Sequence, residues 1–423
     1  MSSVLVVVLF ITGYITIAFE HRFRLDKAAS ALITGVLCWL VYFLQATTPE
    51  SASELLSHHV GSIASILFFL LGAMTIVELI DSHNGFDILT KNIAPKNLSK
   101  LVWMISTITF FLSALLDNLT TAIVMTSLCS KLLNEKEHRL WFAGLIVIAA
   151  NAGGAWSPLG DVTTTMLWIG GQITAMSIIT ATFIPSVIVC LIPTIILARK
   201  FKNIAFQKIE MEPTEHVGEG SIILFSGIGF LLFVPLFKTL THLPPFMGML
   251  LSLGCLWVIT AIIHAGKEPD EKAKLSVANA LQKIDTPSIL FFLGILLAVS
   301  ALESFGVLQS SAAWLTATLQ NDYMIGASLG VLSAIVDNVP LVAAAQGMFS
   351  PAQFAPNHAF WQFLALSTGT GGSMIIIGSA AGVAVMGIEQ IRFGWYVRNI
   401  GWLAAIGFMV GLGVFILQQV LFG

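Results

Sequence analysis

Twelve apolar stretches, each close to or above the length that crosses a bilayer, constrain this chain of 423 residues more than any other feature. A helix needs about 20 apolar residues to span the hydrocarbon core. Charged residues make up 10% of the sequence, whereas soluble domains carry about 25%. The sequence therefore predicts an all-α polytopic membrane protein. The stretches are 3–19, 28–46, 60–81, 101–133, 140–168, 176–198, 221–240, 245–264, 286–304, 323–349, 359–388 and 399–420.

The lysine and arginine content of the loops between these stretches predicts the side of the membrane on which each loop lies, because cytoplasmic loops are enriched in both residues. Cations stand at both ends of 101–133, so we expect this stretch to enter and leave the membrane on one side as a re-entrant hairpin. These cations are Lys91, Lys96 and Lys100 before its start, and Lys131, Lys136 and Arg139 around its end. Interpreting 323–349 as a second hairpin gives ten crossings and places both termini outside. It also puts 19 of the 20 cations on the cytoplasmic face, with Lys238 as the exception.

Polar pairs at the centres of the two hairpins indicate an internal repeat. Asp117-Asn118 follows Ser113 in the first hairpin, and Asp337-Asn338 has the same setting 220 positions later. Phe69–Gly72 and Gly153-Gly154 also recur in the second half, at nearly equal offsets. Because each half holds five crossings, an odd number, the second repeat is predicted to be inverted relative to the first.

This organisation divides the chain into three parts. Residues 1–202 form the first repeat and 221–423 the second. A cytoplasmic linker, 203–220, joins them and contains Glu210, Glu212, Pro213 and Glu215. Stretch 3–19 is too long for a removable signal peptide and lacks a cleavage site, so we expect it to remain as a span.

Asp117 and Asp337 are candidates for a functional site, because a carboxylate inside the membrane is unfavourable. Asp and Asn also cap helices well, which is the simplest structural explanation. A serine would cap without burying a charge, so we favour a cation site. Carboxylates and freed backbone carbonyls are hard oxygen ligands for Na⁺ or Li⁺, and a carboxylate can hold a proton instead.

Glycine and proline interrupt stretches 140–168 and 359–388, which predicts two broken helices. Discontinuous helices bind ions at the midplane of many transporters. Close packing through small residues would explain the glycines, but not Asn151 beside Asp161. The candidates for cation or proton binding are Asp117, Asn118, Asn151, Asp161, Thr163, Thr164, Ser333, Asp337, Asn338, Ser373 and Ser379.

The first half is the more anionic, because Ser379 stands where that half has Asp161. Asp117, Asn118 and Asp161 are therefore expected to hold Na⁺. For Asp337, the expected neighbours are Ser333, Asn338, Ser373 and Ser379.

Acidic residues near helix ends form a second group. Glu78, Asp81 and Glu303 are candidates for proton entry, although solvation at the membrane interface explains them equally well. The four cysteines have no metal-ligand spacing and are interpreted as packing thiols. The sequence has no P-loop or dinucleotide-binding motif. We therefore expect no cofactor, no nucleic-acid partner and no enzymatic activity.

Two segments carry a resemblance to a known family. They are Ser-Ala-Leu-Leu-Asp-Asn-Leu-Thr-Thr-Ala at 113–122 and Asn-Ala-Gly-Gly-Ala-Trp-Ser-Pro-Leu-Gly-Asp-Val-Thr-Thr-Thr at 151–165. They resemble the NhaD-type sodium/proton antiporters, of the ion-transporter superfamily that also contains arsenite permeases and sodium-coupled dicarboxylate carriers. The resemblance runs through nearly the whole chain.

This resemblance implies a homodimer in the inner membrane of the cell, in contact with the lipid bilayer. Each protomer would have a scaffold domain and a transport domain that moves as an elevator, and would export Na⁺ or Li⁺ against incoming H⁺. The positions that match polar residues used for ions in the family are Asp117, Asn118, Asn151, Asp161, Thr163, Thr164, Ser333, Asp337 and Asn338.

Three other functions remain as alternatives. A sodium-coupled organic-anion symporter or an arsenite permease has no evident need for aspartate at both hairpin tips, and neither hairpin nor broken helix contains an internal lysine or arginine. An aspartyl protease would use two carboxylates that share a proton, but it needs neither repeats nor two broken helices.

Overall fold

The computed structural model describes residues 2–18, 20–23, 25–46, 48–86, 95, 97–206 and 217–422. Within these ranges the chain is helical, with no strand and one isolated bridge between Asn97 and Ala205. Four cations used to predict the topology (Arg24, Lys91, Lys96 and Lys208) lie outside the described residues. The same holds for Glu210, Glu212, Pro213 and Glu215 of the expected linker.

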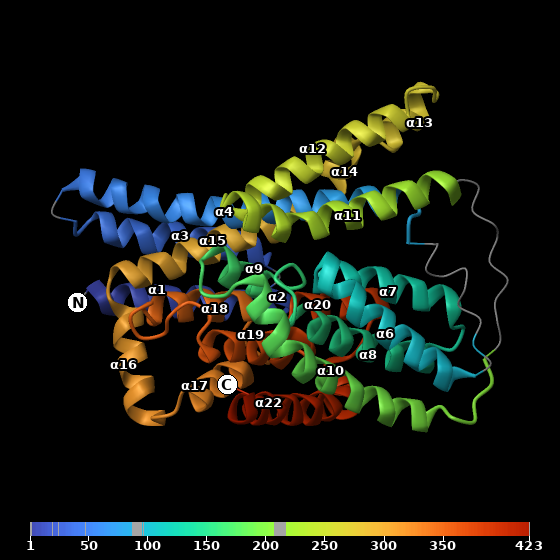
Figure 1. The fold of residues 1–423 in the computed structure, drawn as a ribbon. Helices are drawn as coiled ribbons and strands as arrows, with labels where there is room; N and C mark the ends of the chain where they lie inside the picture. The colour runs from blue at the N-terminus through green and yellow to red at the C-terminus, as the bar shows by residue number, and fades with distance from the viewer. Residues whose placement is uncertain are drawn as a thin grey trace.

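The helices form two layered groups (Figure 1). One group contains α1 (Ser2–Ala18), α3 (Lys27–Phe43), α4 (Pro49–Ser82), α11 (Val217–Thr241), α12 (Pro245–Ile263) and α15 (Thr286–Ser304), with the short helices α2 (Glu20–Phe23), α13 (Pro269–Lys274) and α14 (Val277–Lys283). The other contains α6 (Leu98–Leu116), α7 (Asn118–Leu132), α8 (Lys136–Gly154), α10 (Ala175–Lys200), α17 (Asp322–Leu332), α19 (Ala359–Gly371), α20 (Ala380–Glu389) and α22 (Trp402–Phe422). Each group therefore draws helices from both halves of the sequence.

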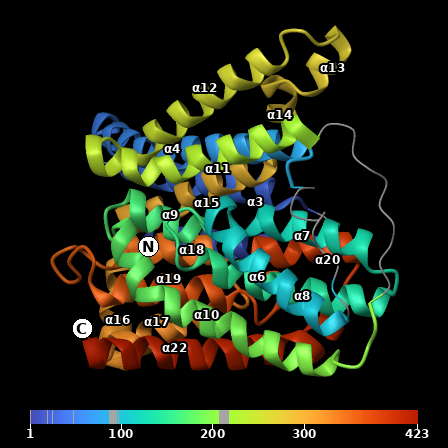
Figure 2. The same ribbon diagram turned by 45° about the vertical axis from the view of Figure 1, so that its right-hand side comes forward.

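Two short helices, α9 (Val162–Ile169) and α18 (Asn338–Met348), lie between the groups. Helix α18 packs against α15 and helix α9 packs against α4, while α9 and α18 also contact each other. Figure 2 shows the same layering after rotation, with α4, α11 and α12 on one side and α10 and α22 on the other. The remaining elements are α16 (Val307–Leu319), η1 (Ile376–Gly378), α21 (Phe393–Tyr396) and the π-helix η2 (Val397–Gly401).

The expectation of an all-α polytopic membrane protein is confirmed. Among the described residues, seven helices are long and apolar enough to cross a membrane: Pro49–Ser82, Leu98–Leu116, Ala175–Lys200, Gly218–Thr241, Pro245–Ile263, Thr286–Ser304 and Phe393–Phe422. Four shorter apolar helices accompany them. The number of crossings and the re-entrant nature of 101–133 and 323–349 stay predictions.

Several segments expected to be loops are helical. Helix α4 begins at Pro49 and runs for 34 residues, so most of 47–59 is helix; proline suits the first turn because the amide it lacks would be unpaired there. Helix α16 occupies most of 305–322, and α11 begins inside the predicted linker at Val217. Alanine, leucine, glutamate and glutamine favour helix in these segments even though the segments are not apolar throughout.

Both hairpins break at the predicted aspartates. Helix α6 ends at Leu116 and α7 begins at Asn118, so Asp117 alone forms the break. In the second half the break is longer and ends at Asp337. Each aspartate then caps the following helix: Asp117 Oδ1 accepts from the Thr120 amide at 2.8 Å, and Asp337 Oδ1 accepts from the Val339 amide at 3.1 Å.

Glycines let these elements approach closely at matched positions. A Cβ atom on Gly153 would collide with the carbonyl oxygen of Phe110, and one on Gly371 would collide with that of Gly330. The broken helices α8–α9 and α19–α20 can therefore press directly on the backbones of α6 and α17.

Candidate functional site

Asp161 is the centre of the site. It precedes α9, where its Oδ1 accepts from the Thr163 amide at 2.9 Å and thereby caps the helix. Its Oδ2 accepts from Asn118 Nδ2 at 2.9 Å and from Asn338 Nδ2 at 3.2 Å. These two asparagines begin α7 and α18, so one buried carboxylate is held by amides from both hairpin tips.

Asn151, near the end of α8, extends this network into the second broken helix. Its Oδ1 accepts from Asn118 Nδ2 at 3.0 Å. Its Nδ2 donates to Ser373 Oγ at 2.9 Å and to Ser379 Oγ at 3.0 Å. Because the Asn151 side chain is fully buried, its donors and acceptors must be satisfied within the protein, and the residues from both halves do this.

Asp117 and Asp337 line the same small cavity as Asp161. The cavity has a volume of about 30 Å³, which is roughly the space that one water molecule or one small cation needs. Its walls also contain Asn118, Asn338 and apolar residues of α4 and α15. Among the described residues, no three His, Cys, Asp or Glu side chains converge tightly enough to hold a resident metal ion. The three carboxylates share one space without forming a tight cluster.

The two hairpin aspartates differ in their surroundings. Asp117 Oδ2 also accepts from Thr120 Oγ1 at 2.8 Å. Its φ is +89°, a region that favours glycine, whereas φ of Asp337 is −49°. The backbone amide of Asp337 donates to Tyr14 Oη of α1 at 3.0 Å, so the second tip is docked on the other helix group.

The remaining candidates support this centre through the backbone. Thr164 Oγ1 donates to the Asp161 carbonyl at 2.9 Å. Ser333 Oγ donates to the Thr368 carbonyl at 2.7 Å. Thr163 Oγ1 is buried without a hydrogen-bond partner. We expect Ser333, Ser373 and Ser379 beside Asp337, but their described hydrogen bonds go elsewhere. Ser333 bonds to Thr368, Ser373 to Asn151, and Ser379 to Asn151 and to the Gly382 amide.

Glu78, Asp81 and Glu303 do not line the cavity that contains Asp161. Glu78 Oε1 lies 3.4 Å from Lys283 Nζ and also accepts from Ser82 Oγ at 3.0 Å. These contacts place Glu78 at the end of α4, and a role of the three residues in proton entry stays a prediction.

Sequence reasoning missed Tyr14 and Lys27, which line a neighbouring cavity together with Asp337. Tyr14 lies in an apolar stretch, and Lys27 is one of three cations in a loop that indicated only topology. Neither signal marks a site until folding brings α1 and α3 to the second hairpin.

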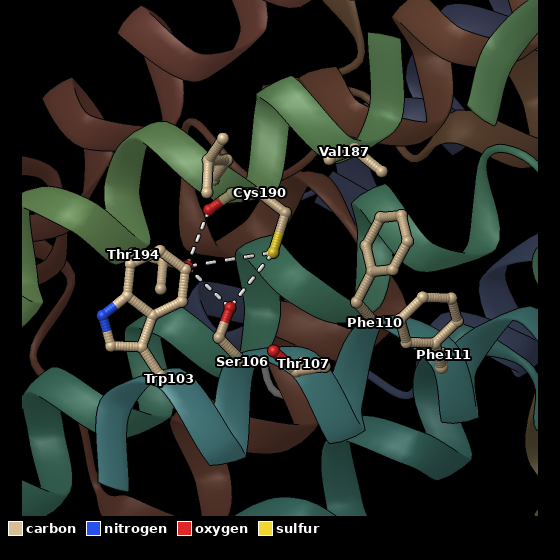
Figure 3. Close-up of a pocket in the computed structure, with 9 residues that line it drawn as sticks. Trp103, Ser106, Thr107, Phe110, Phe111, Val187, Cys190 and Thr194 are labelled. Atoms are coloured by element: carbon tan, nitrogen blue, oxygen red, sulfur yellow. Dashed lines mark hydrogen bonds between the residues drawn. The ribbon is translucent and has the colours of Figure 1, made fainter. Parts of the chain in front are cut away.

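A larger cavity, of about 130 Å³, lies between α6 and α10 and is lined mainly by apolar side chains. Figure 3 shows the hydrogen bonds that join Ser106, Cys190 and Thr194, three residues that line this cavity. Ser106 Oγ lies 2.6 Å from Thr194 Oγ1. Trp103 and Phe111 at its rim are 41% and 50% exposed. Since no charged group among the described residues lines it, this cavity does not suit an ion.

Comparison with known proteins identifies the family of this chain. Residues 7–369 match the family described as "Citrate transporter" (CitMHS). The chain is 45% identical to sodium/proton antiporter 1 of Arabidopsis thaliana, over 98% of this chain and 72% of that protein. It is 30% identical to the Na⁺/H⁺ antiporter NhaD of Alkalimonas amylolytica, over 90% of this chain and 83% of that protein.

A solved structure shows the same fold. The YdaH transporter of Alcanivorax borkumensis superposes with a TM-score of 0.58 at 13% identity and covers 93% of this chain and 98% of its own. The polar network, the helical membrane architecture and these relatives lead to one assignment: the chain belongs to the citrate-transporter family of multi-pass membrane transporters and, within it, to the NhaD-type sodium/proton antiporters.

Proposed function

We propose that this protein is a secondary transporter that exchanges cytoplasmic Na⁺ or Li⁺ for external H⁺ at the cavity of Asp117, Asp161 and Asp337. The observation that carries the proposal is the position of Asp161, whose carboxylate accepts amide hydrogen bonds from Asn118 and Asn338. Named relatives that are sodium/proton antiporters support the same activity.

The chemistry of the cavity fits a small cation. The described hydrogen bonds of Asn118 and Asn338 use only amide nitrogens, which leaves their side-chain oxygens as candidate ligands. Carboxylate and amide oxygens are hard ligands, suited to hard cations rather than to soft ones. We assign Asp161 as the principal ligand, with Asp117 and Asp337 supplying further negative charge.

Competition between Na⁺ and H⁺ follows from burying several carboxylates in one space. Such groups are strongly destabilised when they are charged and unpaired, so each must be neutralised by a proton or a cation. A site loaded with Na⁺ has less need of protons, and a protonated site attracts Na⁺ less. Alternate loading from the two faces of the membrane then couples export of one ion to import of the other.

The layered fold suits relative movement of two bodies. Helices α9 and α18 carry the site between the two helix groups, and the second hairpin tip contacts Tyr14 across that boundary. We propose that the group containing α1, α3, α4, α11, α12 and α15 is a scaffold, by which two copies associate, and that the other group moves as an elevator.

Proton flux in proteoliposomes tests the proposal. An imposed pH gradient across the vesicle membrane should collapse when Na⁺ or Li⁺ is added, and K⁺ should have little effect. Asp161→Asn keeps the size of the side chain but removes its titration and its charge, so the response should fall to background. An unchanged response in a folded Asp161→Asn protein would contradict the assignment.

A citrate carrier is the second candidate, because the matching family carries that description. Citrate is an anion, and the described residues that line the cavity of Asp161 include three carboxylates and no lysine or arginine. Like charges at close range repel strongly in a partly buried site. Citrate and arsenite therefore belong in the same vesicle assay, and uptake of citrate without a Na⁺-dependent pH response would favour this candidate.

A further inference from the structure

A second cavity adjoins the proposed ion site, on the other side of the second hairpin tip. It measures about 50 Å³ and contains Tyr14, Glu20 and Lys27 together with Asp337. Asp337 and Ala380 line both cavities. Asp337 therefore forms part of the wall between the ion site and a second space, which residues of α1, α2, α3, α15, η1 and α20 also line.

Among the residues that the structure describes, Lys27 is the only lysine or arginine that lines either of these two cavities. It is the first residue of α3, which Asp26 caps by accepting from the Ala28 amide at 2.7 Å. Its Nζ lies 5.2 Å from the ring centre of Phe291, another residue of the same cavity. The aromatic ring and the cap thus hold the ammonium group on the side of the cavity formed by α3 and α15.

The described charged groups around Asp337 differ between its two sides: the second cavity contains one ammonium group and one further carboxylate, whereas the first contains only carboxylates. Glu20, Lys27 and the Tyr14 hydroxyl share the second cavity with it, while Asp117 and Asp161 share the first. The second tip is also docked by the hydrogen bond from its backbone amide to Tyr14. Docking keeps the Asp337 carboxylate at the boundary, where it faces an ammonium on one side and the ion site on the other.

We propose that Lys27 is the built-in counter-ion of Asp337 and that its ammonium group competes with Na⁺ for this carboxylate. The inference rests on the proposed Na⁺/H⁺ exchange and adds a residue that sets its affinity. When the ion site holds no cation, Lys27 partly neutralises Asp337. A Na⁺ ion or a proton that approaches Asp337 then meets a carboxylate whose charge is already compensated, so both bind more weakly.

Na⁺ binding to the purified full-length protein, measured with radiolabelled Na⁺ at two pH values, tests this role. Lys27→Gln removes the charge, and Lys27→Met does so while retaining most of the aliphatic stem against Phe291. Both should bind Na⁺ on the order of tenfold more tightly at alkaline pH, the effect of one unit charge across a partly buried cavity. Lys27→Arg should stay close to the wild type.

The pH dependence separates this role from a structural one. Removing the ammonium also strengthens proton binding at Asp337, so the advantage of Lys27→Gln over the wild type should shrink as the pH falls. Lys100→Gln is the matched control, since it removes an exposed cation from the predicted cytoplasmic side and lines neither cavity. It should leave Na⁺ affinity unchanged at both pH values.

Unchanged Na⁺ affinity in both Lys27→Gln and Lys27→Met at alkaline pH would overturn the inference, as would an equal change in Lys100→Gln. These failures are distinct from a failure of the proposed function. If the wild type exchanges Na⁺ for H⁺ but the Lys27 variants bind like it, only the role of Lys27 falls. If the wild type neither binds Na⁺ nor responds to it in vesicles, the proposed function itself fails and the role of Lys27 falls with it.

Discussion

The two halves of the molecule make the same backbone contacts but place different chemistry on them. Ser113 Oγ donates to the Ala150 carbonyl at 2.6 Å, and Ser333 Oγ, 220 positions later, donates to the Thr368 carbonyl at 2.7 Å. Gly153 and Gly371 each press on a carbonyl of the adjacent hairpin helix. The contacts that shape each site segment are thus present twice.

The charges are not duplicated in the same way. Asp161 caps α9 in the first half, whereas Ser379 caps α20 at the matched place. Asp117 has strained backbone geometry, and Asp337 instead has a contact with Tyr14. Close packing therefore gives the two halves the same local backbone arrangement, whereas the ionisable side chains at matched positions differ between them.

The largest effect is expected when Asp161 is replaced by serine, the residue that the second half has at the matched position, Ser379. Asp161→Ser leaves a helix cap but removes the carboxylate that accepts from Asn118 and Asn338. Na⁺-dependent collapse of a pH gradient should fall to background in vesicles. Ser379→Ala, which changes the matched cap without altering charge, should retain most of the activity; equal losses in both variants would contradict the asymmetry between the halves.

Asn151→Ala should come next, because this side chain connects the halves. The change removes the described hydrogen-bond partner of the Ser373 hydroxyl, at about 1–3 kcal/mol for a buried group left unsatisfied. It also removes one of the two hydrogen bonds of the Ser379 hydroxyl and one of the two of the Asn118 amide. A lower midpoint of thermal unfolding in detergent would show the loss. Ser373→Ala removes one of these bonds and should lower the midpoint less; a larger loss in Ser373→Ala would show that Asn151 is not the connecting residue.

The backbone of the hairpin tips gives a matched pair of smaller effects. At Asp117, φ of +89° with ψ of +155° is a region that only glycine occupies readily, at a cost of about 1–3 kcal/mol for other residues. Asp117→Gly should therefore be neutral or stabilising in thermal unfolding while Na⁺ exchange declines. At Asp337 the backbone is not strained, so glycine relieves nothing there. Asp337→Gly should therefore be destabilised, because glycine raises the chain entropy of the unfolded state. Similar unfolding midpoints in the two variants would argue against strain at Asp117.

Installing a carboxylate in the second half tests whether charge alone distinguishes the halves. Ser379→Asp places an acid next to Asn151, in a network that already contains Asp161. We expect a changed apparent Na⁺ affinity or a steeper pH dependence of exchange, since a further buried carboxylate adds a proton that Na⁺ must displace. An unaltered pH profile would indicate that position 379 is isolated from the ion site.

The halves also meet at the ends of α4 and α12, where His83 Nε2 lies 3.0 Å from His264 Nε2. Burial lowers the pKa of both imidazoles below their usual range, and nearby Lys267 lowers it further. The unfolded chain therefore binds more protons below about pH 6.5, so stability is present above that pH and is lost as the pH falls through it. The midpoint of thermal unfolding should fall slightly as the pH falls, and His264→Gln should make this decrease smaller. An equally large decrease in His264→Gln would show that other groups cause it.

Much of this arrangement follows from local signals in the sequence. Apolar length predicts the helices, and Asp117, Asp337 and the glycine-rich segments predict the breaks because these residues disrupt or cap helices directly. The partners across the site could not be predicted in the same way. That Asn118 and Asn338 share Asp161, and that Asn151 binds Ser373 and Ser379, depends on packing between segments about 180 to 230 positions apart.

The position of Tyr14 and Lys27 depends on tertiary structure still more completely. Both belong to helices at the start of the chain, and nothing in their local sequence indicates contact with a hairpin more than 300 positions away. The helical extent of 47–59 and 305–322 was missed for another reason. Hydropathy detects the part of a helix that lies in lipid, and not the part that continues beyond it.

The sharing of one carboxylate by amides from both hairpins makes the two halves of the chain depend on each other. Asp161 and Asn118 come from the first half and Asn338 from the second, so neither half can form this centre alone. A change that moves either hairpin tip therefore alters the surroundings of the same carboxylate.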